Sequence, residues 1–275
     1  MPLEALIWDV DGTLAETEEG HRAAFNASFA AAGLDWHWDA ALYARLLDVT
    51  GGKERIRRYL DTTPGAGPLD DESVRRLHAA KTARYVAAVA AGSVALRPGV
   101  RRLLHEAHAA GLRLAIATTT SPANVEALLL ATLGPGGPGL FEVIGAGDMV
   151  PRKKPAPDIY RYVLDRLRLP GNRCLAFEDT PNGLAAAQSA GIPVVVTTSL
   201  YGGTGGFADA LLVVDGLGDP DAPCRVLSGP PLPTPVIDVP ALRQLLAATN
   251  HPPGPLGSAH KPQPRPQSPL PPGEG

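Results

Sequence analysis

Two aspartates near the start of the chain have a spacing that suits phosphate-ester chemistry. Asp9 and Asp11 lie in the segment DVDGTL of residues 9–14, directly after the apolar residues 5–8. The first carboxylate can attack phosphorus, the second can transfer protons, and both can face a divalent cation. The glycine after Asp11 permits a sharp turn. We therefore expect residues 5–8 to form a buried strand that presents Asp9 at its end.

Further polar groups follow segments that have the pattern of strands. These groups are Thr118 and Thr119 after residues 112–117, Lys154 on the loop before residue 157, and Glu178 and Asp179 after residues 174–177. In an open parallel sheet, ligands bind beyond the carboxyl ends of the strands. We therefore expect these groups to converge with Asp9 and Asp11 on one site.

Phosphoryl transfer needs such a set, because the transferring group spreads negative charge over its oxygens and must be positioned and stabilised. Carboxylate oxygens suit Mg²⁺. The expected metal ligands are Asp9, Asp11, Glu178 and Asp179. Lys154 would add a fixed cation, and the Thr118 hydroxyl would hold phosphate oxygens. Singly, each group also has a structural interpretation, such as a solvated lysine or part of a helix cap, but their convergence favours a site.

Strands and helices alternate in the second part of the chain, which predicts an α/β fold with a doubly wound parallel sheet. Residues 17–92 have a helical pattern without a good strand candidate, which predicts an inserted all-helical cap. We expect residues 1–16 and 93–249 to form the catalytic core around this cap.

The C-terminal part of the chain has a weaker pattern. We expect an edge strand within residues 211–215 and a last helix over residues 240–248. Residues 250–275 hold nine prolines and almost no large apolar residue. Such a composition predicts a disordered tail.

The composition narrows the classes of partner. The 275 residues carry a formal net charge of −3 without a block of like charges, so neither nucleic acid nor an anionic membrane is expected as partner. No apolar run approaches the roughly 20 residues of a membrane span. The first strand begins so early that we expect no signal peptide. Cys174 and Cys224 match no metal-binding spacing, so we expect reduced thiols in a cytoplasmic protein.

Four segments together resemble the four motifs of the haloacid dehalogenase superfamily of hydrolases. They are residues 9–14 (DVDGTL), 116–118 (IAT), 154–158 (KPAPD) and 178–183 (EDTPNG). The resemblance implies Mg²⁺-dependent chemistry through an aspartyl-phosphate. The implied roles are nucleophile for Asp9, acid/base for Asp11, phosphate binding for Thr118 and Lys154, and metal binding for Glu178 and Asp179. The helical insertion is similar to the cap of the β-phosphoglucomutase-like subgroup.

Within this superfamily, the chain also resembles the CbbY-type phosphatases of carbon-fixation operons. The similarity lies in residues 13–19 (TLAETEE), 36–38 (WHW), 50–56 (TGGKERI) and 117–121 (ATTTS). It implies hydrolysis of xylulose 1,5-bisphosphate, a misfire product of Rubisco in the Calvin cycle, to xylulose 5-phosphate. We expect a monomer whose partner is this small-molecule sugar phosphate.

The same similarity implies that the cap holds the distal phosphate and the sugar hydroxyls. The candidates are Glu18, His21, Gly51, Gly52, Lys53 and Lys81. The two glycines expose backbone N–H groups beside the Lys53 ammonium, which suits a phosphate. His21 equally fits a satisfied histidine, and Lys81 a solvated lysine. Residues 201–206 (YGGTGG) suggest a phosphate loop, but we favour a flexible turn.

Two alternative activities remain open at this point. A sugar phosphomutase uses the same aspartyl-phosphate and returns the phosphoryl group to a sugar, and a phosphatase for another small sugar phosphate needs the same residues. β-Phosphoglucomutases place an arginine where Lys53 aligns, which argues against the mutase. The complete set of catalytic residue types disfavours a non-catalytic binding module.

Overall fold

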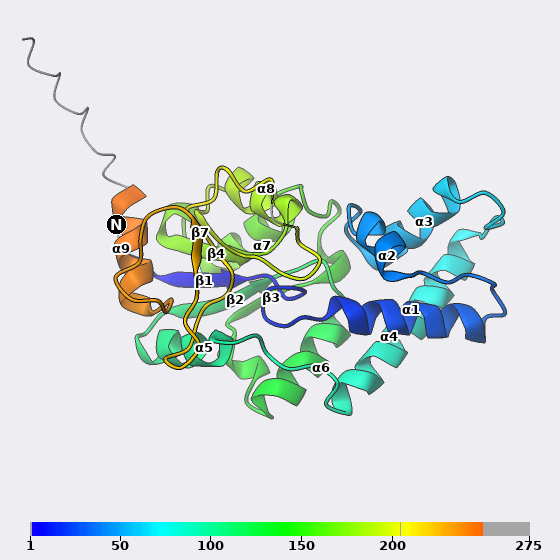
Figure 1. Cartoon of the computed structure of the whole chain (residues 1–275), viewed down its shortest axis with the longest axis horizontal. Helices are drawn as coiled ribbons and strands as arrows, with labels where there is room; N and C mark the ends of the chain where they lie inside the picture. The colour runs from blue at the N-terminus through cyan, green and yellow to red at the C-terminus, as the bar shows by residue number, and fades with distance from the viewer. Residues whose placement is uncertain (1, 204, 250–275) are drawn as a thin grey trace, which may run out of the picture.

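Within residues 2–203 and 205–249, which the computed structural model describes, the chain forms a seven-stranded sheet with helices on both faces (Figure 1). The strands are β1 (Ala5–Trp8), β2 (Arg113–Ala117), β3 (Val143–Gly145), β4 (Cys174–Glu178), β5 (Val194–Thr197), β6 (Leu212–Val214) and β7 (Val226–Ser228). Their order is β3-β2-β1-β4-β5-β6-β7, and all neighbours are parallel except β6 and β7. The predicted α/β fold with a parallel sheet is confirmed.

β1 is an interior strand of the sheet, and its four apolar residues are fully buried. It pairs with β2 on one side and β4 on the other, so that Trp8 lies opposite both Ile116 and Phe177. The Trp8 and Phe177 rings stack with their centroids 4.0 Å apart. Because the three strands are parallel and in this register, the residues that follow them meet at one edge of the sheet.

Alternate side chains of β1 pack on opposite faces of the sheet. Leu6 and Trp8 join one hydrophobic cluster, and Ala5 and Ile7 join another. The helices of the first face are α5 (Val100–Ala109), α6 (Pro122–Leu133) and α9 (Val239–Thr249), and those of the second face are α7 (Asp158–Leu167) and α8 (Pro181–Ser189). Short 3₁₀ turns occur at η1 (Pro138–Leu140), η2 (Gly147–Met149) and η3 (Gly171–Arg173).

A further group of helices lies beyond the carboxyl ends of the parallel strands (Figure 1). Its members are α1 (Glu18–Ala31), α2 (Ala40–Leu46), α3 (Gly52–Thr62) and α4 (Asp71–Ala90). They share a separate cluster rich in aromatic side chains, among which Phe25, Phe29 and Trp38 are fully buried. α4 also packs against α6, and its Tyr85 and Val89 join the first cluster of the sheet. These helices agree with the helical pattern predicted for residues 17–92, and we call them the cap.

The C-terminal part of the sheet differs from the prediction for residues 211–215. β6 forms within that range, but it is not an edge strand, because β7 pairs with it in the antiparallel orientation. All three residues of β7 are exposed, so this strand has no buried face. The alternation of apolar and polar residues that marks a half-buried strand is therefore missing from its sequence. The last helix, α9, forms as expected, and the predicted disordered tail lies outside the described residues.

Both cysteines are free and buried, as expected for reduced thiols. Among the residues that the structure describes, no helix combines the length and the apolar character that a bilayer crossing requires.

Candidate active site

The loop after β1 folds tightly against the end of β4. The backbone N–H of Asp9 donates to the Phe177 carbonyl over 3.0 Å, and that of Leu14 donates to the Val10 carbonyl over 2.9 Å. Gly12 has φ +78°, and a Cβ there would collide with the Asp179 carboxylate. Only glycine therefore allows the loop to turn this close to the acidic residues after β4.

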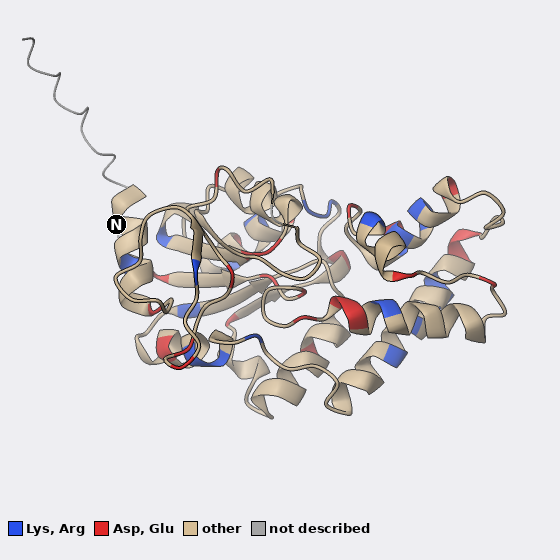
Figure 2. Ribbon diagram, viewed as in Figure 1, with Lys and Arg blue, Asp and Glu red and all other residues tan. Residues whose placement is uncertain are grey.

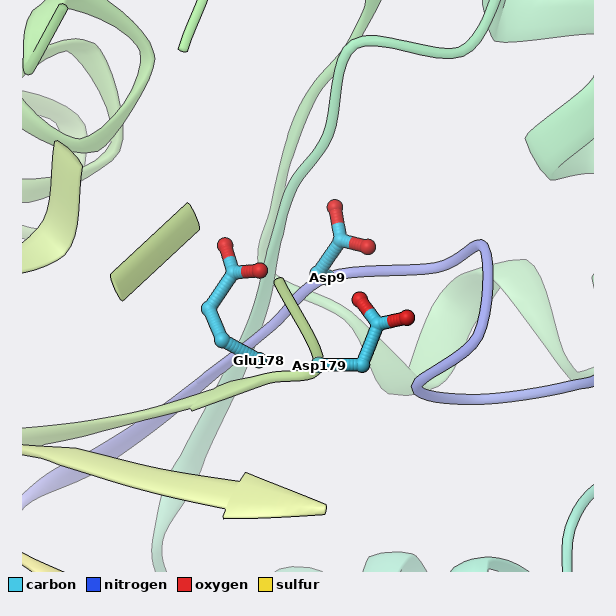
Figure 3. A group of neighbouring side chains, drawn as sticks. All are labelled: Asp9, Glu178 and Asp179. Atoms are coloured by element: carbon cyan, nitrogen blue, oxygen red, sulfur yellow. The ribbon is translucent and has the colours of Figure 1, made fainter. Parts of the chain in front are cut away.

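Asp9, Glu178 and Asp179 form a buried acidic group (Figure 3). One carboxylate oxygen from each lies within 4.8 Å of the others, and the residues are 7%, 1% and 4% exposed. The Lys154 Nζ lies 2.6 Å from Asp9 Oδ1 and 2.6 Å from Glu178 Oε1. The Tyr160 hydroxyl also donates to Glu178. Among the described residues that contact this group, Lys154 is the single cation, and it pairs with two of the three carboxylates.

These contacts are visible in the acid–base properties of the group. Burial, helped by the nearby charges of Glu178 and Asp11, raises the pKa of Asp9 to about 7 although Lys154 opposes the shift. Burial and the charge of Asp9 raise the pKa of Asp179 well above its ordinary value. Burial alone would lower the pKa of Lys154, but Asp9 and Glu178 outweigh it and raise that pKa. The group therefore has a deficit of positive charge.

The acidic group fits a divalent cation. Asp179 Oδ2 accepts from the Ser199 hydroxyl over 2.6 Å, but Asp179 Oδ1 is buried and has no hydrogen-bond partner within residues 2–203 and 205–249. An unsatisfied buried carboxylate oxygen is costly unless a cation or water completes its coordination. Hard oxygen ligands from Asp9, Glu178 and Asp179 are those that Mg²⁺ prefers. Three of the four residues expected to bind a metal therefore lie together.

Asp11, the fourth expected ligand, is not part of this group. Its Oδ1 accepts a hydrogen bond from the Thr17 hydroxyl over 2.5 Å and lies 3.0 Å from His21 Nε2. Burial would raise the pKa of Asp11, but the charge and hydrogen bond of His21 and the hydrogen bond of Thr17 lower it below its ordinary value. The prediction that the Asp11 carboxylate faces the metal therefore needs correction: it turns towards the cap, because the first residues of α1 offer it two donors.

Lys81 is buried and not solvated, so the solvated interpretation was wrong. Its Nζ lies 2.8 Å from His21 Nδ1 and over the rings of Phe25 and Tyr85. Because an ammonium can only donate, it assigns the proton of a neutral His21 to Nε2, which faces Asp11. Burial lowers the pKa of Lys81 to about 8, and burial together with Lys81 lowers that of His21.

A cleft of about 580 Å³ lies between the cap and the sheet edge. Nearly all predicted site residues line it, namely Asp9, Asp11, Glu18, His21, Gly51, Gly52, Lys53, Lys81, Thr118, Thr119, Lys154 and Asp179. Glu178 is the exception, although it contacts Lys154, which does line the cleft. Thr118 is 1% exposed, and its hydroxyl accepts from the Thr120 N–H over 3.3 Å. Tyr201, Gly202 and Gly203 also line the cleft.

Glu18 lies at the cap side of this cleft in a chain of polar contacts. The Tyr43 hydroxyl donates to Glu18 Oε2 over 2.6 Å, and Arg55 donates to the Tyr43 hydroxyl over 3.0 Å. Gly51 has φ +97° at the start of α3, and a Cβ on Gly52 would collide with the His78 ring. The two glycines therefore let the backbone at the start of α3 pass close to the His78 ring in the wall of the cleft.

Lys53 takes part in a contact that joins the cap to the core. Asp148 lies 2.6 Å from Lys53 Nζ of the cap and 2.8 Å from Lys153 Nζ of the core. Hydrogen bonds from Lys153 and Lys53 lower the pKa of Asp148 to about 2. Burial and the charges of Lys81, Lys53 and Lys153 lower the pKa of His78 to about 4. Figure 2 shows the basic segments of α3 and of the loop before α7 facing one another.

Several residues of the site were not predicted. They are Thr17, Tyr43, Arg55, His78, Asp148, Lys153, Tyr160 and Ser199. Ser199 follows β5, so the rule that sites lie beyond the carboxyl ends of strands would have found it. Tyr160 lies at an apolar position of α7, and its sequence neighbours give no signal of a polar role.

Comparisons with known proteins agree with this geometry. The sequence profile of the haloacid dehalogenase-like hydrolases matches residues 3–191. The plasmid-encoded CbbY protein of Cupriavidus necator is 53% identical over 224 residues, which are 80% of this chain and 88% of that protein.

Solved structures show the same similarity. An aspartate-to-asparagine mutant of CbbY from Rhodobacter sphaeroides, crystallised with xylulose 1,5-bisphosphate, superimposes with a TM-score of 0.75 at 50% identity, over 78% of this chain and 96% of that chain. The β-phosphoglucomutase of Clostridium difficile has the same fold at 21% identity, with a TM-score of 0.64 over 78% of this chain and 91% of that chain. The chain therefore belongs to the haloacid dehalogenase-like hydrolases and, among them, to the CbbY proteins.

Proposed function

We propose that this chain is a Mg²⁺-dependent phosphatase that converts xylulose 1,5-bisphosphate to xylulose 5-phosphate and so removes an inhibitor of Rubisco. The observation that carries the proposal is that Asp9 belongs to a buried acidic group suited to a metal ion and also contacts Lys154. The cleft beside Asp9 is also lined by Lys53 and Lys153. The similarity to the CbbY structure crystallised with xylulose 1,5-bisphosphate supports this choice of sugar.

Asp9 is the nucleophile in this proposal. A carboxylate oxygen of Asp9 attacks phosphorus, the bond from phosphorus to the sugar oxygen breaks, and Asp11 gives its proton to that oxygen. Asp11 then takes a proton from a water molecule whose oxygen attacks phosphorus, which releases inorganic phosphate and restores the Asp9 carboxylate. Lys154 and the Thr118 hydroxyl hold the phosphoryl oxygens during both transfers.

Mg²⁺ held by Asp9, Glu178 and Asp179 would screen the repulsion between the Asp9 carboxylate and the anionic substrate. The protein itself supplies the proton transfer through the two environments of Asp11. Against Thr17 and His21 the pKa of Asp11 is low, so Asp11 rests there as an ionised carboxylate. When Asp11 turns towards the substrate it leaves both donors, so burial dominates and raises its pKa, which suits an acid.

The second phosphate of a bisphosphate has a suitable place beside Lys53 and Lys153. These two ammonium groups, one from the cap and one from the core, converge on the single carboxylate of Asp148. A phosphate dianion offers more acceptors and more charge than this carboxylate. We propose that it takes the place of Asp148 between the lysines, which favours bisphosphates over monophosphates. Glu18 is then available for a sugar hydroxyl.

We propose that the active form is a monomer with a small molecule as its substrate, because the described residues of a single chain already bring the acidic group, Lys154 and the cleft together. The two free, buried cysteines support action in the reducing cytoplasm.

A phosphate-release screen across sugar monophosphates and bisphosphates, with Mg²⁺ and with EDTA, tests the proposal. We expect the strongest Mg²⁺-dependent release from ketose bisphosphates. Conversion of β-glucose 1-phosphate to glucose 6-phosphate without free phosphate would instead identify a phosphomutase.

A further inference from the structure

The cap and the core are joined by two linkers that run side by side. The first follows the loop of residues 9–14 after β1, which we call the catalytic loop, and leads into α1. The second leads from α4 to α5. Ala15 and Leu96 form an antiparallel bridge between them, and the Arg97 N–H donates to the Leu14 carbonyl over 2.9 Å. The root of the cap therefore lies only a few residues from Asp11 in sequence and in space.

Arg97, in the second linker, binds the surrounding backbone with its whole guanidinium group. Its side chain is only 10% exposed. Its acceptors are the carbonyls of Gly12, Thr197 (3.3 Å), Thr198 (2.5 Å) and Asp215 (3.4 Å) and the Thr197 hydroxyl (3.1 Å), and its Nε lies 3.3 Å from Glu16 Oε1. One side chain thus connects the catalytic loop, the first linker and the backbone after β5.

Two of these acceptors adjoin the residues that orient Asp11. Gly12 follows Asp11 directly in the chain, and Glu16 precedes Thr17, whose hydroxyl donates to Asp11 Oδ1 over 2.5 Å. The backbone after β5 leads to Ser199, which donates to Asp179. Arg97 therefore ties the backbone that follows Asp11 to the backbone after β5, although it contacts neither the Asp11 nor the Asp179 carboxylate.

We propose that Arg97 is a positioning residue for proton transfer, which couples the root of the cap to the backbone that carries Asp11. The inference rests on the proposed function, in which Asp11 protonates the leaving oxygen. A guanidinium presents five N–H donors in a rigid plane, whereas an ammonium presents three donors at one point. Lysine at this position would keep the charge near Glu16 but would lose the simultaneous contacts to separate carbonyls.

A comparison of two substrates with different leaving groups distinguishes a positioning role of Arg97 from a general loss of protein stability. A sugar alkoxide needs protonation as it departs, whereas p-nitrophenolate departs readily without it. Because kcat/KM reports only the steps up to the first transfer, it reflects this difference directly. General acid catalysis contributes about 10²–10⁴-fold, and we expect Arg97→Met to lower kcat/KM for the sugar bisphosphate at least about tenfold more than for p-nitrophenyl phosphate.

Arg102 provides a matched control on the neighbouring helix. Its guanidinium also binds backbone carbonyls, those of Gly218 at 2.7 Å and Ile237 at 3.0 Å, but none of them belongs to the catalytic loop. We expect Arg102→Met to change kcat/KM for the two substrates by the same factor. Thermal melting of each variant measures any loss of stability separately.

Chemical rescue gives a second readout. A cavity of about 240 Å³, lined by Arg97, Thr13, Thr197 and Asp215, lies beside the guanidinium. Millimolar guanidinium, far below denaturing concentrations, is expected to restore sugar bisphosphate turnover of Arg97→Met through its kcat, whereas it leaves Arg102→Met unchanged. Arg97→Lys is expected to show the same selective loss, which keeps the comparison available if the methionine variant does not fold.

The proposal is overturned if Arg97→Lys has wild-type kcat/KM for the sugar bisphosphate, or if the Arg97 variants lower kcat/KM for both substrates by the same factor. Wild-type turnover is measured first, in a separate experiment. If the wild-type protein hydrolyses p-nitrophenyl phosphate but no sugar bisphosphate, the proposed function fails, and the Arg97 comparison is then made with the sugar phosphate that the wild type does hydrolyse.

Discussion

The buried acidic group makes the stability of the metal-free protein depend on pH through Asp9. The folded pKa of Asp9 is about 7, whereas its ordinary value is 3.8, so the folded protein binds a proton that the unfolded chain has lost between these two values. Stability contributed by this group is therefore present at low pH and is lost as pH rises towards the folded pKa. Each pH unit in this interval corresponds to about 1.4 kcal/mol.

Between pH 5 and pH 7.5, this linkage predicts that wild-type protein in EDTA loses about 2.5 kcal/mol of unfolding free energy relative to Asp9→Asn. The amide variant is the proper reference, because it keeps His21 and His78, whose lowered pKa values act in the opposite direction below pH 6.5. Urea unfolding followed by circular dichroism at several pH values gives both free energies. Mg²⁺ should restore more stability to the wild type at pH 7.5 than at pH 5.

A difference between the two proteins that does not change with pH would refute this reasoning. It would mean that Asp9 is ionised throughout the range without a metal ion, and hence that Lys154 alone compensates the three carboxylates. A difference that grows with pH in favour of the wild type would refute it as well, because the sign would be reversed.

Three further predictions concern individual side chains. Lys154→Met should lower the unfolding free energy in EDTA by about 3–5 kcal/mol at pH 7.5, since it leaves buried carboxylates without a counter-ion; unchanged urea midpoints would argue against the buried pair. Asp11→Asn should lower kcat/KM for sugar phosphates by about 10²–10⁴-fold, and wild-type rates in this variant would exclude Asp11 as the acid. Lys53→Ala should raise KM for the bisphosphate by about tenfold and leave KM for p-nitrophenyl phosphate unchanged. A charged hydrogen bond contributes about 1.5–3 kcal/mol, from which the cost of displacing Asp148 is subtracted. An equal rise in KM for both substrates would show that Lys53 does not bind the second phosphate.

Much of the fold was predictable because its elements have strong local signals. β1, β4 and β5 are short apolar runs, and each is followed by polar residues at the same edge of the sheet. Asp9, Thr118 and Asp179 could be brought together by this rule alone. β7 could not be found, because an exposed antiparallel strand of three residues is defined by its partner and not by its own pattern.

The orientation of side chains was less accessible from sequence. Asp11 was expected to face the metal, but it lies against Thr17 and His21, since the start of α1 brings two donors next to it. Lys81 was weighed as a solvated lysine, although the packing of α4 against α1 buries it beside His21. Such contacts depend on how helices pack, and single-sequence periodicity reports only which face is apolar.

Steady-state hydrolysis of xylulose 1,5-bisphosphate and ribulose 1,5-bisphosphate by the same Mg²⁺-loaded protein tests the central claim most directly. We expect stoichiometric phosphate and xylulose 5-phosphate from the first substrate, a far lower kcat/KM for the second, and no release by Asp9→Asn. Equal turnover of the two bisphosphates would contradict the proposed specificity, and an active Asp9→Asn variant would contradict the aspartyl-phosphate mechanism itself.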